Sequence, residues 1–470
     1  MTQIKFGTDG WRAEMDTAFT FENVEILAQA FSDYVRDVQK SSGSPRVVIG
    51  YDFRRDSENF ADHFARVLIA NGIRVTLSDR AVPTPAVSRA VITDKYDFGI
   101  AVTASHNPAG YNGIKIKDAD GSSADKSVTD AVEACIKKNP VRREPAGSAD
   151  SCHQDLLTPY LKCLVEYLDL DVFQKRGFKV LMDSMHGVGE RHIEAILRNS
   201  PLQIETLRPE RDVKFGGVAP EPIPKNITGL MERMKTGSYD AGFVTDGDAD
   251  RIAAVRPGGD FVTPGAVLSL ILLHLAEDRG RKGDVVTTVS NTSLINRVAR
   301  GLGLKIHETP VGFKYLVDVM RKHPVLIAGE ESGGIAFENY MFERDGLLSA
   351  LLVIQMMEYR GQTMTELLND MERRFGKFRY ARKDFKYPDE LKIPFMEHVR
   401  KLETDSIEGT RVVGKNLKDG VKFLLENDAW LLFRMSGTEP LLRIYAESQD
   451  EGAPERLVAW GEKLAFSLTQ

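Results

Sequence analysis

The chain has 470 residues, of which 42% are hydrophobic and 28% are charged, a balance typical of folded proteins that excludes a largely disordered chain. At ~150 residues per domain, this length predicts about three domains. The chain contains 62 Lys and Arg residues and 68 Asp and Glu residues, which gives a formal net charge of −6. This charge excludes the overall positive field of a typical nucleic-acid-binding protein.

Cysteine usage and hydropathy favour a cytoplasmic protein. Cys135, Cys152 and Cys163 form no CxxC pair, which is typical of a reducing compartment. The longest apolar run, at 267–275, is shorter than the ~20 residues that a membrane span needs. The first ten residues contain no apolar signal core. We expect a protein that binds neither membranes nor nucleic acid.

Strand and helix patterns alternate from residue 20 to residue 328. This alternation predicts α/β domains built on parallel strands with right-handed crossovers. The first copy contains helices at 20–39 and 57–70 and strands at 46–51, 73–77 and 97–102. The second contains strands at 178–183, 202–207 and 241–244 and helices at 189–198 and 227–235. The third contains strands at 284–289, 304–308 and 325–328 and helices at 293–302 and 311–321.

The pattern changes after Phe375. A polar stretch, strands at 421–425 and 429–433 and a closing helix at 450–468 are typical of a smaller α+β domain. The predicted fold is therefore three similar mixed-sheet α/β domains plus a C-terminal α+β domain around a central active-site cleft. We expect their bounds at 1–148, 149–255, 256–373 and 374–470.

Each α/β copy ends in a polar loop that contains glycine. These loops read TASHNPAGYNG, TDGDADR and GEESGG. Ligands of open α/β sheets bind at the carboxyl ends of strands, so three such loops favour three domains that face one cleft. A Gly-Val-Gly segment at 187–189 resembles part of a dinucleotide fingerprint, but the third glycine is replaced by His192, and NAD is not expected.

Three carboxylates alternate in one of these loops. Asp246, Asp248 and Asp250 point the same way in an extended segment and repel one another unless a cation lies between them. Oxygen ligands of this kind favour Mg²⁺ or Mn²⁺. An EF-hand is excluded, because its sixth and twelfth positions are Arg251 and Pro257. Two alternatives are a solvated acidic turn and a phosphatase in which Asp246 is the nucleophile.

A serine in the first polar loop is the candidate nucleophile. Ser105 follows the strand at 97–102, His106 and Lys115 are near it in sequence, and glycines follow that allow close approach of a phosphate. The G-x-S-x-G elbow of hydrolases is absent. A serine can carry a phosphoryl group when a metal neutralises the oxygens, whereas the alternative is an ordinary turn-forming serine.

Two further segments favour a phosphorylated sugar as the ligand. The segment 434–443 joins small hydroxyl and backbone donors to two arginines, which suits phosphate oxygens, although a turn with surface arginines is the alternative. Glu330, Glu331 and Ser332 suit sugar hydroxyls, and the segment 309–314 adds Lys314.

Six motifs together resemble the α-D-phosphohexomutase family, the phosphoglucomutase/phosphomannomutase type. In chain order they are FGTDGWR, TASHNPAGYNGIKI, DGDADR, TPVGFKY, GEESGG and RMSGTEP. The resemblance covers nearly the whole chain.

The resemblance implies a role for each motif. It implies that Ser105 is a phosphoserine and, together with Asp246, Asp248 and Asp250, holds Mg²⁺. It implies that Lys115 is the general base and that Arg12, His106 and Arg251 line the reaction centre. The implied substrate-binding residues are Thr309, Gly312, Lys314, Glu330, Ser332, Arg434, Ser436, Gly437, Thr438 and Arg443.

The implied activity is the interconversion of hexose 1-phosphate and hexose 6-phosphate through a hexose 1,6-bisphosphate, which serves as intermediate and activator. Gly334 stands where mannose- and glucosamine-type members often have His, which favours glucose. Tyr51 stands where members often have Arg, and Met435 where they have Pro or Phe. The alternatives are a phosphomannomutase, a phosphoglucosamine mutase, the Asp-nucleophile phosphatase and a silent sugar-phosphate-binding protein. We expect a monomer or a homodimer.

Overall fold

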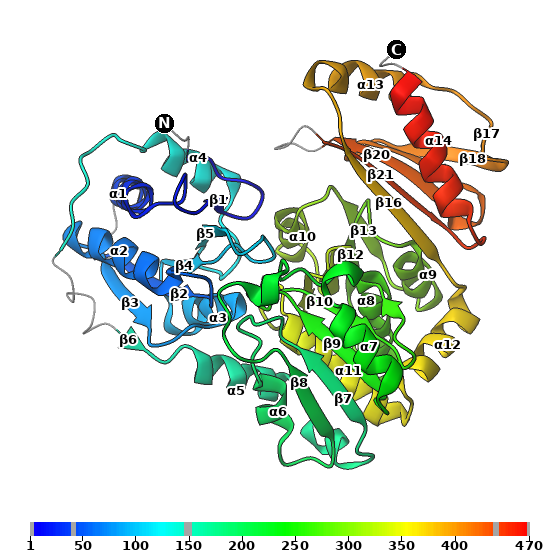
Figure 1. Cartoon of the computed structure of the whole chain (residues 1–470), viewed down its shortest axis with the longest axis horizontal. Coiled ribbons are helices and arrows are strands. Elements are labelled where there is room, and N and C mark those ends of the chain that lie inside the picture. The colour runs from blue at the N-terminus through cyan, green and yellow to red at the C-terminus, as the bar shows by residue number, and fades with distance from the viewer. Residues whose placement is uncertain (1–3, 39–43, 145–152, 436–440, 468–470) are drawn as a thin grey trace. The chain divides into compact units, whose positions relative to one another are not determined.

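The computed structural model describes residues 4–38, 44–144, 153–435 and 441–467 (Figure 1). The chain forms two compact units. One unit contains residues 1–267 and 332–365, and the other contains 268–331 and 366–470. None of the helices in the described ranges combines the length and apolar character that crossing a bilayer requires. Cys135 and Cys163 are buried free thiols, whereas Cys152 lies outside the described residues.

The first sheet belongs to the first unit and has the strand order β1-β5-β4-β2-β3-β6. Strands β2, β3, β4 and β6 run parallel, whereas β5 is antiparallel to both β4 and β1. The strands are β1 (Trp11–Glu14), β2 (Arg46–Tyr51), β3 (Arg74–Ser78), β4 (Phe98–Val102), β5 (Tyr111–Lys117) and β6 (His153–Gln154).

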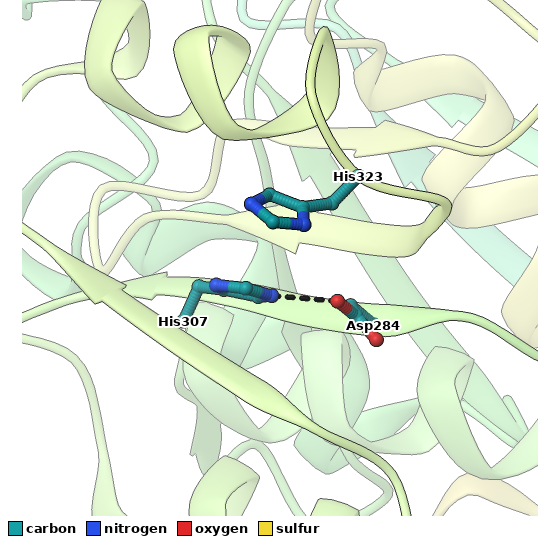
Figure 2. Close-up of side chains that lie close together, drawn as sticks. All are labelled: Asp284, His307 and His323. Carbon is teal, nitrogen blue, oxygen red and sulfur yellow. Dashed lines mark hydrogen bonds and ion pairs between the residues drawn. The ribbon is translucent and has the colours of Figure 1, made fainter.

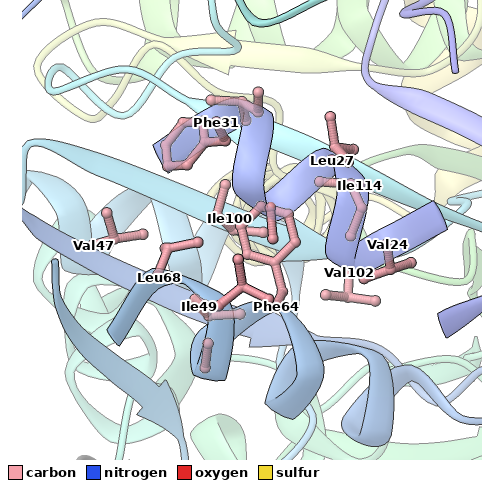
Figure 3. Packing of buried hydrophobic residues seen from close by; sticks show 14 of the residues in the cluster. Val24, Leu27, Phe31, Val47, Ile49, Phe64, Leu68, Ile100, Val102 and Ile114 are labelled. Atoms are coloured by element: carbon pink, nitrogen blue, oxygen red, sulfur yellow. The ribbon is translucent and has the colours of Figure 1, made fainter. Parts of the chain in front are cut away.

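Apolar side chains from two helices cover one face of this sheet. Helices α1 (Phe21–Val38) and α2 (Ser57–Ala70) meet β2, β4 and β5 there, as Figure 3 shows. Phe31, Phe64 and Ile100 are fully buried in this cluster. Full burial of one such side chain contributes about 1.5–3 kcal/mol to folding, so this core fixes the β4–β5 connection on which Ser105 lies.

The opposite face of the first sheet is covered by α3 (Thr84–Asp94). A Cβ at Gly50 or Gly99 would overlap the Val87 or Val91 side chain of this helix, so α3 packs directly on the backbone of β2 and β4. This close packing places Thr84, the first residue of α3, beside the end of β2.

The second sheet, also in the first unit, has the strand order β11-β10-β9-β7-β8. Strands β7, β8 and β9 are parallel, β10 is antiparallel to β9, and β11 is antiparallel to β10. The strands are β7 (Lys179–Asp183), β8 (Gln203–Leu207), β9 (Ala241–Thr245), β10 (Ile252–Val255) and β11 (Phe261–Val262). The tight turn from β9 to β10 carries the three aspartates.

The second unit contains a parallel sheet and an antiparallel sheet. The parallel strands follow the order β13-β12-β14, with β12 (Asp284–Thr288), β13 (Ile306–Thr309) and β14 (Val325–Gly329). The antiparallel sheet has the order β16-β21-β20-β19-β18-β17. Its strands are β16 (Arg379–Lys386), β17 (Ser406–Ile407), β18 (Thr410–Asn416), β19 (Val421–Leu425), β20 (Trp430–Met435) and β21 (Leu441–Ser448). Helix α14 (Ala453–Ser467) packs across this sheet (Figure 1).

The two sheets of the second unit are joined by a buried contact. Trp430 and Tyr445 pack against Val289, and Glu447 accepts hydrogen bonds from Trp430 Nε1 at 2.9 Å and from the Ser293 backbone N–H at 2.6 Å. Because Glu447 is nearly inaccessible to solvent, these bonds hold β20 and β21 firmly on the first turn of α9 (Ser293–Gly301).

The remaining elements connect or flank these sheets. The helices are α4 (Lys126–Ala134), α5 (Leu157–Tyr167), α6 (His192–Leu197), α7 (Thr228–Thr236), α8 (Pro264–Leu273), α10 (Phe313–Met320), α11 (Gly346–Arg360), α12 (Met364–Phe375) and α13 (Asp389–Lys401), and the remaining strand is β15 (Ile335–Phe337). Short helical turns occupy Leu170–Gln174, Phe215–Gly217, Pro224–Asn226, His274–Asp278 and Glu426–Asp428.

The predicted fold class, three mixed-sheet α/β domains and a C-terminal α+β domain, is confirmed. The strands predicted in the three α/β copies are parallel as expected, but the sequence pattern missed the antiparallel strands β5 and β10 and the edge strand β11. The loops before β5 and β10, at 103–110 and 246–251, are too short for a crossover helix and therefore join antiparallel strands. The sequence pattern also missed β16, because its residues are mostly polar and partly exposed.

A buried carboxylate begins α11. Asp345 accepts hydrogen bonds from the Leu348 N–H at 2.8 Å and from the hydroxyls of Tyr160 and Tyr340 at 3.0 and 2.7 Å. Burial disfavours the ionised form more strongly than these bonds favour it and raises the pKa of Asp345 from 3.8 to about 6. The stability that Asp345 contributes is therefore fully present below about pH 4 and is lost as the pH rises through about 6.

Replacement of Asp345 by Asn should make this pH dependence visible. The asparagine does not titrate, so the stability advantage of the wild-type protein over Asp345→Asn should shrink by ~3 kcal/mol between pH 4 and pH 7. Thermal melting of both proteins at several pH values measures the difference between their free energies of unfolding. Groups that titrate equally in both proteins do not affect this difference. An advantage that stays constant or grows with pH would contradict the assignment.

Candidate active site

Ser105 lies in the loop between β4 and β5 and is completely buried. Its backbone has a φ of 51°, in the left-handed region that a serine adopts at a cost of about 1 kcal/mol. The Ser105 N–H donates to Thr103 Oγ1 at 2.8 Å, and its hydroxyl donates to Asp246 Oδ2 at 2.7 Å. The structure therefore brings the predicted nucleophile and the first predicted metal ligand into direct contact, 141 residues apart in the chain.

The shape of the Ser105 loop depends on Arg54. The buried guanidinium donates to the carbonyl oxygens of Ser105 and Asn107, both at 2.6 Å, and to those of Pro108 at 2.9 Å and Tyr111 at 3.0 Å. Hydrogen bonds from a charged donor are worth about 1.5–3 kcal/mol each, so four of them outweigh the strain at Ser105. Arg54 follows β2 directly and is thereby fixed by the core of the first sheet.

The aspartate loop packs closely against the serine loop. Asp246, Asp248 and Asp250 are fully buried, and one oxygen of each lies within 4.8 Å of the others. A Cβ at Gly247 would lie 2.7 Å from the Ser105 carbonyl oxygen, so the two loops approach this closely only with glycine at this position. The loop that resembled a partial dinucleotide fingerprint packs here, because the Val188 N–H donates to the Gly247 carbonyl at 3.1 Å.

Two buried cations lie against these carboxylates. Lys115 Nζ lies 2.8 Å from Asp248 Oδ2, 3.0 Å from Asp250 Oδ2 and 3.1 Å from Asp9 Oδ2. Arg344 Nη2 lies 2.6 Å from Asp9 Oδ2 and 2.7 Å from Asp250 Oδ2. Because buried carboxylates are stable only when their charge is compensated, these contacts make it possible to bury three acids side by side.

The electrostatic surroundings of Asp246 and Asp248 differ. For Asp246, burial together with the charges of Asp248 and Asp250 raises the pKa well above its ordinary value. For Asp248, burial acts in the same direction, but the Lys115 ammonium outweighs it and lowers the pKa. Burial favours the neutral form of Lys115, yet the surrounding Asp248, Asp250 and Asp9 outweigh it and raise the pKa, so Lys115 carries a proton at neutral pH.

Unsatisfied oxygens indicate room for a cation. Asp248 Oδ1 and Asp250 Oδ1 are buried and accept no hydrogen bond, although buried polar atoms in proteins are nearly always satisfied. Together with Asp246 they form an all-oxygen donor set, which suits Mg²⁺ better than Zn²⁺ or copper. The residues present therefore fit a magnesium site.

The other predicted residues of the reaction centre lie around this cluster. Arg12 Nη1 donates to Asn107 Oδ1 at 3.0 Å, and Arg251 Nε lies 3.9 Å from Asp246 and from Asp250. Burial, followed by the charges of Arg251 and Arg12, lowers the pKa of His106 well below 6.5, so its imidazole is neutral at physiological pH.

In the second unit, the predicted sugar-binding segments lie at strand ends. Thr309 ends β13, and Gly312, with a φ of 131°, precedes α10. The Gly312 N–H donates to Glu330 Oε1 at 3.1 Å, which joins the segments that follow β13 and β14. Lys314 lies on the first turn of α10, and its Nζ is 5.0 Å from the centroid of the Tyr315 ring.

The predicted phosphate cradle is partly described. Arg434 and Arg443 are direct cross-strand partners on β20 and β21, and each also contacts an acid: Arg434 Nε lies 2.8 Å from Asp419 Oδ2, and Arg443 Nε lies 3.5 Å from Asp384 Oδ2. Asp419 also accepts the Val311 N–H at 2.9 Å, which ties the cradle to the segment before α10. Ser436, Gly437 and Thr438 lie outside the described residues. Ser332 is half-buried in the first unit.

Four residues that contact the site were not singled out in the sequence. Asp9 and Arg344 balance the charge, Arg54 shapes the serine loop, and Thr84 Oγ1 donates to Asp248 Oδ2 at 2.7 Å. Asp9 lies within the FGTDGWR motif, which was a usable signal. Arg344 carries no local signal, since its partner Asp9 is 335 residues away.

Comparisons with known proteins agree along the whole chain. Residues 3–143, 158–259 and 263–375 match phosphoglucomutase/phosphomannomutase alpha/beta/alpha domains I, II and III, and residues 390–459 match the C-terminal domain. The "Phosphoglucomutase/phosphomannomutase" of Thermococcus kodakarensis is 27% identical over 462 residues, 98% of each chain. The "Probable phosphoglucosamine mutase" of Pyrococcus abyssi is 30% identical over 461 residues, 98% of this chain and 97% of the relative. A crystal structure from Thermus thermophilus that carries a phosphomannomutase name superposes with a TM-score of 0.87 at 32% identity, covering 98% of this chain and 99% of that one.

Shortening Arg54 should loosen the Ser105 loop. Lysine keeps the charge but cannot reach four carbonyl oxygens, so the loss of even one charged hydrogen bond should speed hydrogen exchange of the 103–111 amides by at least about tenfold. Hydrogen-exchange mass spectrometry compares Arg54→Lys with Arg55→Lys, in which the adjacent arginine is half-exposed and paired with Asp16. Equal protection of the loop in both variants would show that Arg54 does not shape it.

Proposed function

Because this chain belongs to the phosphoglucomutase/phosphomannomutase family of phosphohexomutases, we propose that it interconverts hexose 1-phosphate and hexose 6-phosphate, with glucose as the preferred sugar. Ser105 is the proposed carrier of the phosphoryl group. The observation that supports this role most strongly is the 2.7 Å contact between Ser105 Oγ and the acidic loop that fits a magnesium ion.

The proposed reaction has two phosphoryl transfers. In the first, the P–O bond to Ser105 breaks and a P–O bond forms to the free hydroxyl of the hexose monophosphate. That hydroxyl loses its proton, the Ser105 oxygen takes one up, and a hexose 1,6-bisphosphate results. In the second, the P–O bond to the other phosphate of the sugar breaks and a P–O bond forms to Ser105, whose hydroxyl loses its proton while the sugar oxygen takes one up. Positioning and electrostatic stabilisation supply most of the catalysis in reactions of this kind.

Asp246, Asp248 and Asp250 are the proposed ligands of Mg²⁺. When bound, Mg²⁺ would neutralise charge on the transferring phosphoryl oxygens and, by sharing the carboxylates that hold the Lys115 proton, favour release of that proton. Lys115 is the proposed general base, and the same side chain can return the proton to the leaving oxygen.

The positively charged side chains have proposed roles in binding the phosphoryl group. Arg12 and Arg251 lie beside Asn107 and the aspartates, where their guanidinium groups can donate to phosphoryl oxygens. His106 is held neutral by burial and by these two arginines, so it can act as a hydrogen-bond donor without adding charge.

Two further sets of residues are proposed to hold the rest of the substrate. Glu330 is the proposed acceptor of sugar hydroxyls, together with Ser332, Thr309, Gly312 and Lys314. The proposed cradle for the non-reacting phosphate consists of Arg434, Ser436, Gly437, Thr438 and Arg443. Support comes from the cross-strand pairing of Arg434 and Arg443, because directly opposite residues of an antiparallel pair project from the same face of the sheet.

The preference for glucose rests on Gly334. The Arg344 side chain packs directly over Gly334, so any Cβ there would overlap it. A histidine, as the mannose- and glucosamine-type sequences often have, would displace Arg344 from Asp250 and Asp9. The names of the relatives include glucosamine and mannose types, so the sugar has to be measured.

Replacement of Ser105 by Ala should abolish mutase turnover. Without a phosphoryl carrier we expect kcat to fall by at least about 10³-fold, whereas Ser200→Ala should keep the wild-type rate, because the Ser200 hydroxyl bonds locally, to the Leu197 carbonyl and the Leu202 N–H. Coupled assays of hexose 6-phosphate formation measure both variants.

The same assay separates the alternatives. Near-normal turnover of Ser105→Ala would refute the covalent role. Release of inorganic phosphate, with a phosphoryl label on Asp246, would identify the phosphatase. Tight binding of a hexose phosphate by the wild-type protein without isomerisation would identify a sugar-phosphate-binding protein that has no catalytic activity.

Sugar preference is tested by kcat/KM for glucose, mannose and glucosamine 1-phosphates side by side. We expect the value for glucose to be highest in the wild-type protein. Gly334→His should lower kcat for all three sugars, because it moves Arg344 away from the aspartate that it neutralises. A dominant value for mannose or glucosamine would overturn the assignment of glucose and leave the two-transfer reaction standing.

A further inference from the structure

A second cluster of metal-binding side chains lies in the second unit, apart from the residues used above. Asp284 is the first residue of β12, His307 is the second residue of β13, and His323 lies between α10 and β14. His307 pairs in register with Val286, so it projects from the same side of the sheet as Asp284, two residues earlier on β12. Figure 2 shows the His323 ring lying over the His307–Asp284 pair.

The distances in this cluster suit a shared ligand. His307 Nε2 lies 2.6 Å from Asp284 Oδ2, and the two imidazole rings have centroids 4.5 Å apart with an interplanar angle of 33°. One donor atom from each residue lies within 4.8 Å of the other two. Donors around a tetrahedral Zn²⁺ lie about 3.4 Å apart, so small side-chain rotations convert this arrangement into a metal site.

The backbone holds the three residues in place. The His323 N–H donates to the Val319 carbonyl at 3.0 Å and its carbonyl accepts the Val325 N–H at 2.9 Å, which fixes the turn after α10. The Asp284 N–H donates to the Pro324 carbonyl at 2.7 Å, so the strand and the turn are already joined beside the cluster. The ligand positions are therefore set by the fold of this sheet.

The cluster is open to solvent on one side. The side chains of Asp284 and His307 are 18% and 16% exposed, and His323 is exposed. A cation can enter from the surface, and water can complete its coordination shell.

We propose that Asp284, His307 and His323 form a binding site for Zn²⁺. Two imidazole nitrogens and one carboxylate favour Zn²⁺ over Mg²⁺, in contrast to the all-oxygen set of Asp246, Asp248 and Asp250. The site lies at the amino-terminal end of β12, whereas Thr309 is the last residue of β13 and Glu330 directly follows β14, at the carboxyl ends of these strands. The bound ion would tie the turn after α10 to two strands and stabilise this sheet.

His323 distinguishes a metal site from an ordinary surface hydrogen bond. The His307–Asp284 bond needs no third residue, whereas Zn²⁺ loses one of three protein ligands in His323→Ala. A matched control is His63→Ala, because His63 Nδ1 forms the same kind of pair with Glu25 at 2.8 Å but belongs to no metal-binding group among the described residues.

The experiment uses the full chain without an affinity tag. Bound metal is first removed with a chelator, and excess Mg²⁺ is then added to occupy Asp246, Asp248 and Asp250. Zn²⁺ is titrated by calorimetry, and Co²⁺ by the visible absorption that nitrogen-containing four-coordinate sites give. We expect one Zn²⁺ per chain with a Kd below ~1 μM, and an affinity at least tenfold lower for His323→Ala and for Asp284→Asn. His63→Ala should bind Zn²⁺ as the wild-type protein does.

Two results would overturn the proposal. One is the absence of Zn²⁺ binding to the wild-type chain. The other is equal affinity of the wild-type and His323→Ala proteins, which would place the ion elsewhere. Melting curves without metal establish that the variants fold, and Zn²⁺ should raise the melting temperature of the wild-type chain but not that of His323→Ala.

Discussion

The structure depends on the compensation of buried negative charge by Lys115. Its ammonium group lies within 3.1 Å of Asp9, Asp248 and Asp250, and none of these three contacts is local in the chain. Without a cation, adjacent carboxylates in a solvent-free site would repel one another strongly enough to open the loop that carries them. The same contact holds β5 of the first sheet against the β9–β10 turn of the second. It thereby brings the hydroxyl of Ser105 to Asp246.

Each loop in the candidate site is shaped by an element of regular structure. The β4–β5 loop is held by Arg54, which follows β2, and the aspartate loop is the tight turn between β9 and β10. Asp248 is further fixed by Thr84 at the start of α3, a helix that packs directly on the backbone of β2 and β4. The candidate site thus lies on loops, while the buried core fixes the positions of these loops, as a pre-organised active site requires.

Most strands, and the residues at their ends, could be predicted from the sequence. Ser105 and Asp246 were found because a polar, glycine-containing loop after an apolar strand is a local pattern. Strands β5 and β10 were missed, because each follows directly on a short polar loop where the alternating pattern predicts a helix next. Arg344 was missed because its role depends on partners distant in the chain. The predicted domain bounds, the roles of the site residues and the sugar remain predictions.

The most direct test of the account follows one labelled phosphoryl group through a single turnover. Protein phosphorylated with ³²P on Ser105 is mixed with excess hexose 1-phosphate and quenched at times shorter than one catalytic cycle. The account predicts that label leaves Ser105 and enters hexose bisphosphate at least as fast as kcat, before labelled hexose 6-phosphate forms. Product that appears while the label stays on the protein would contradict the central claim.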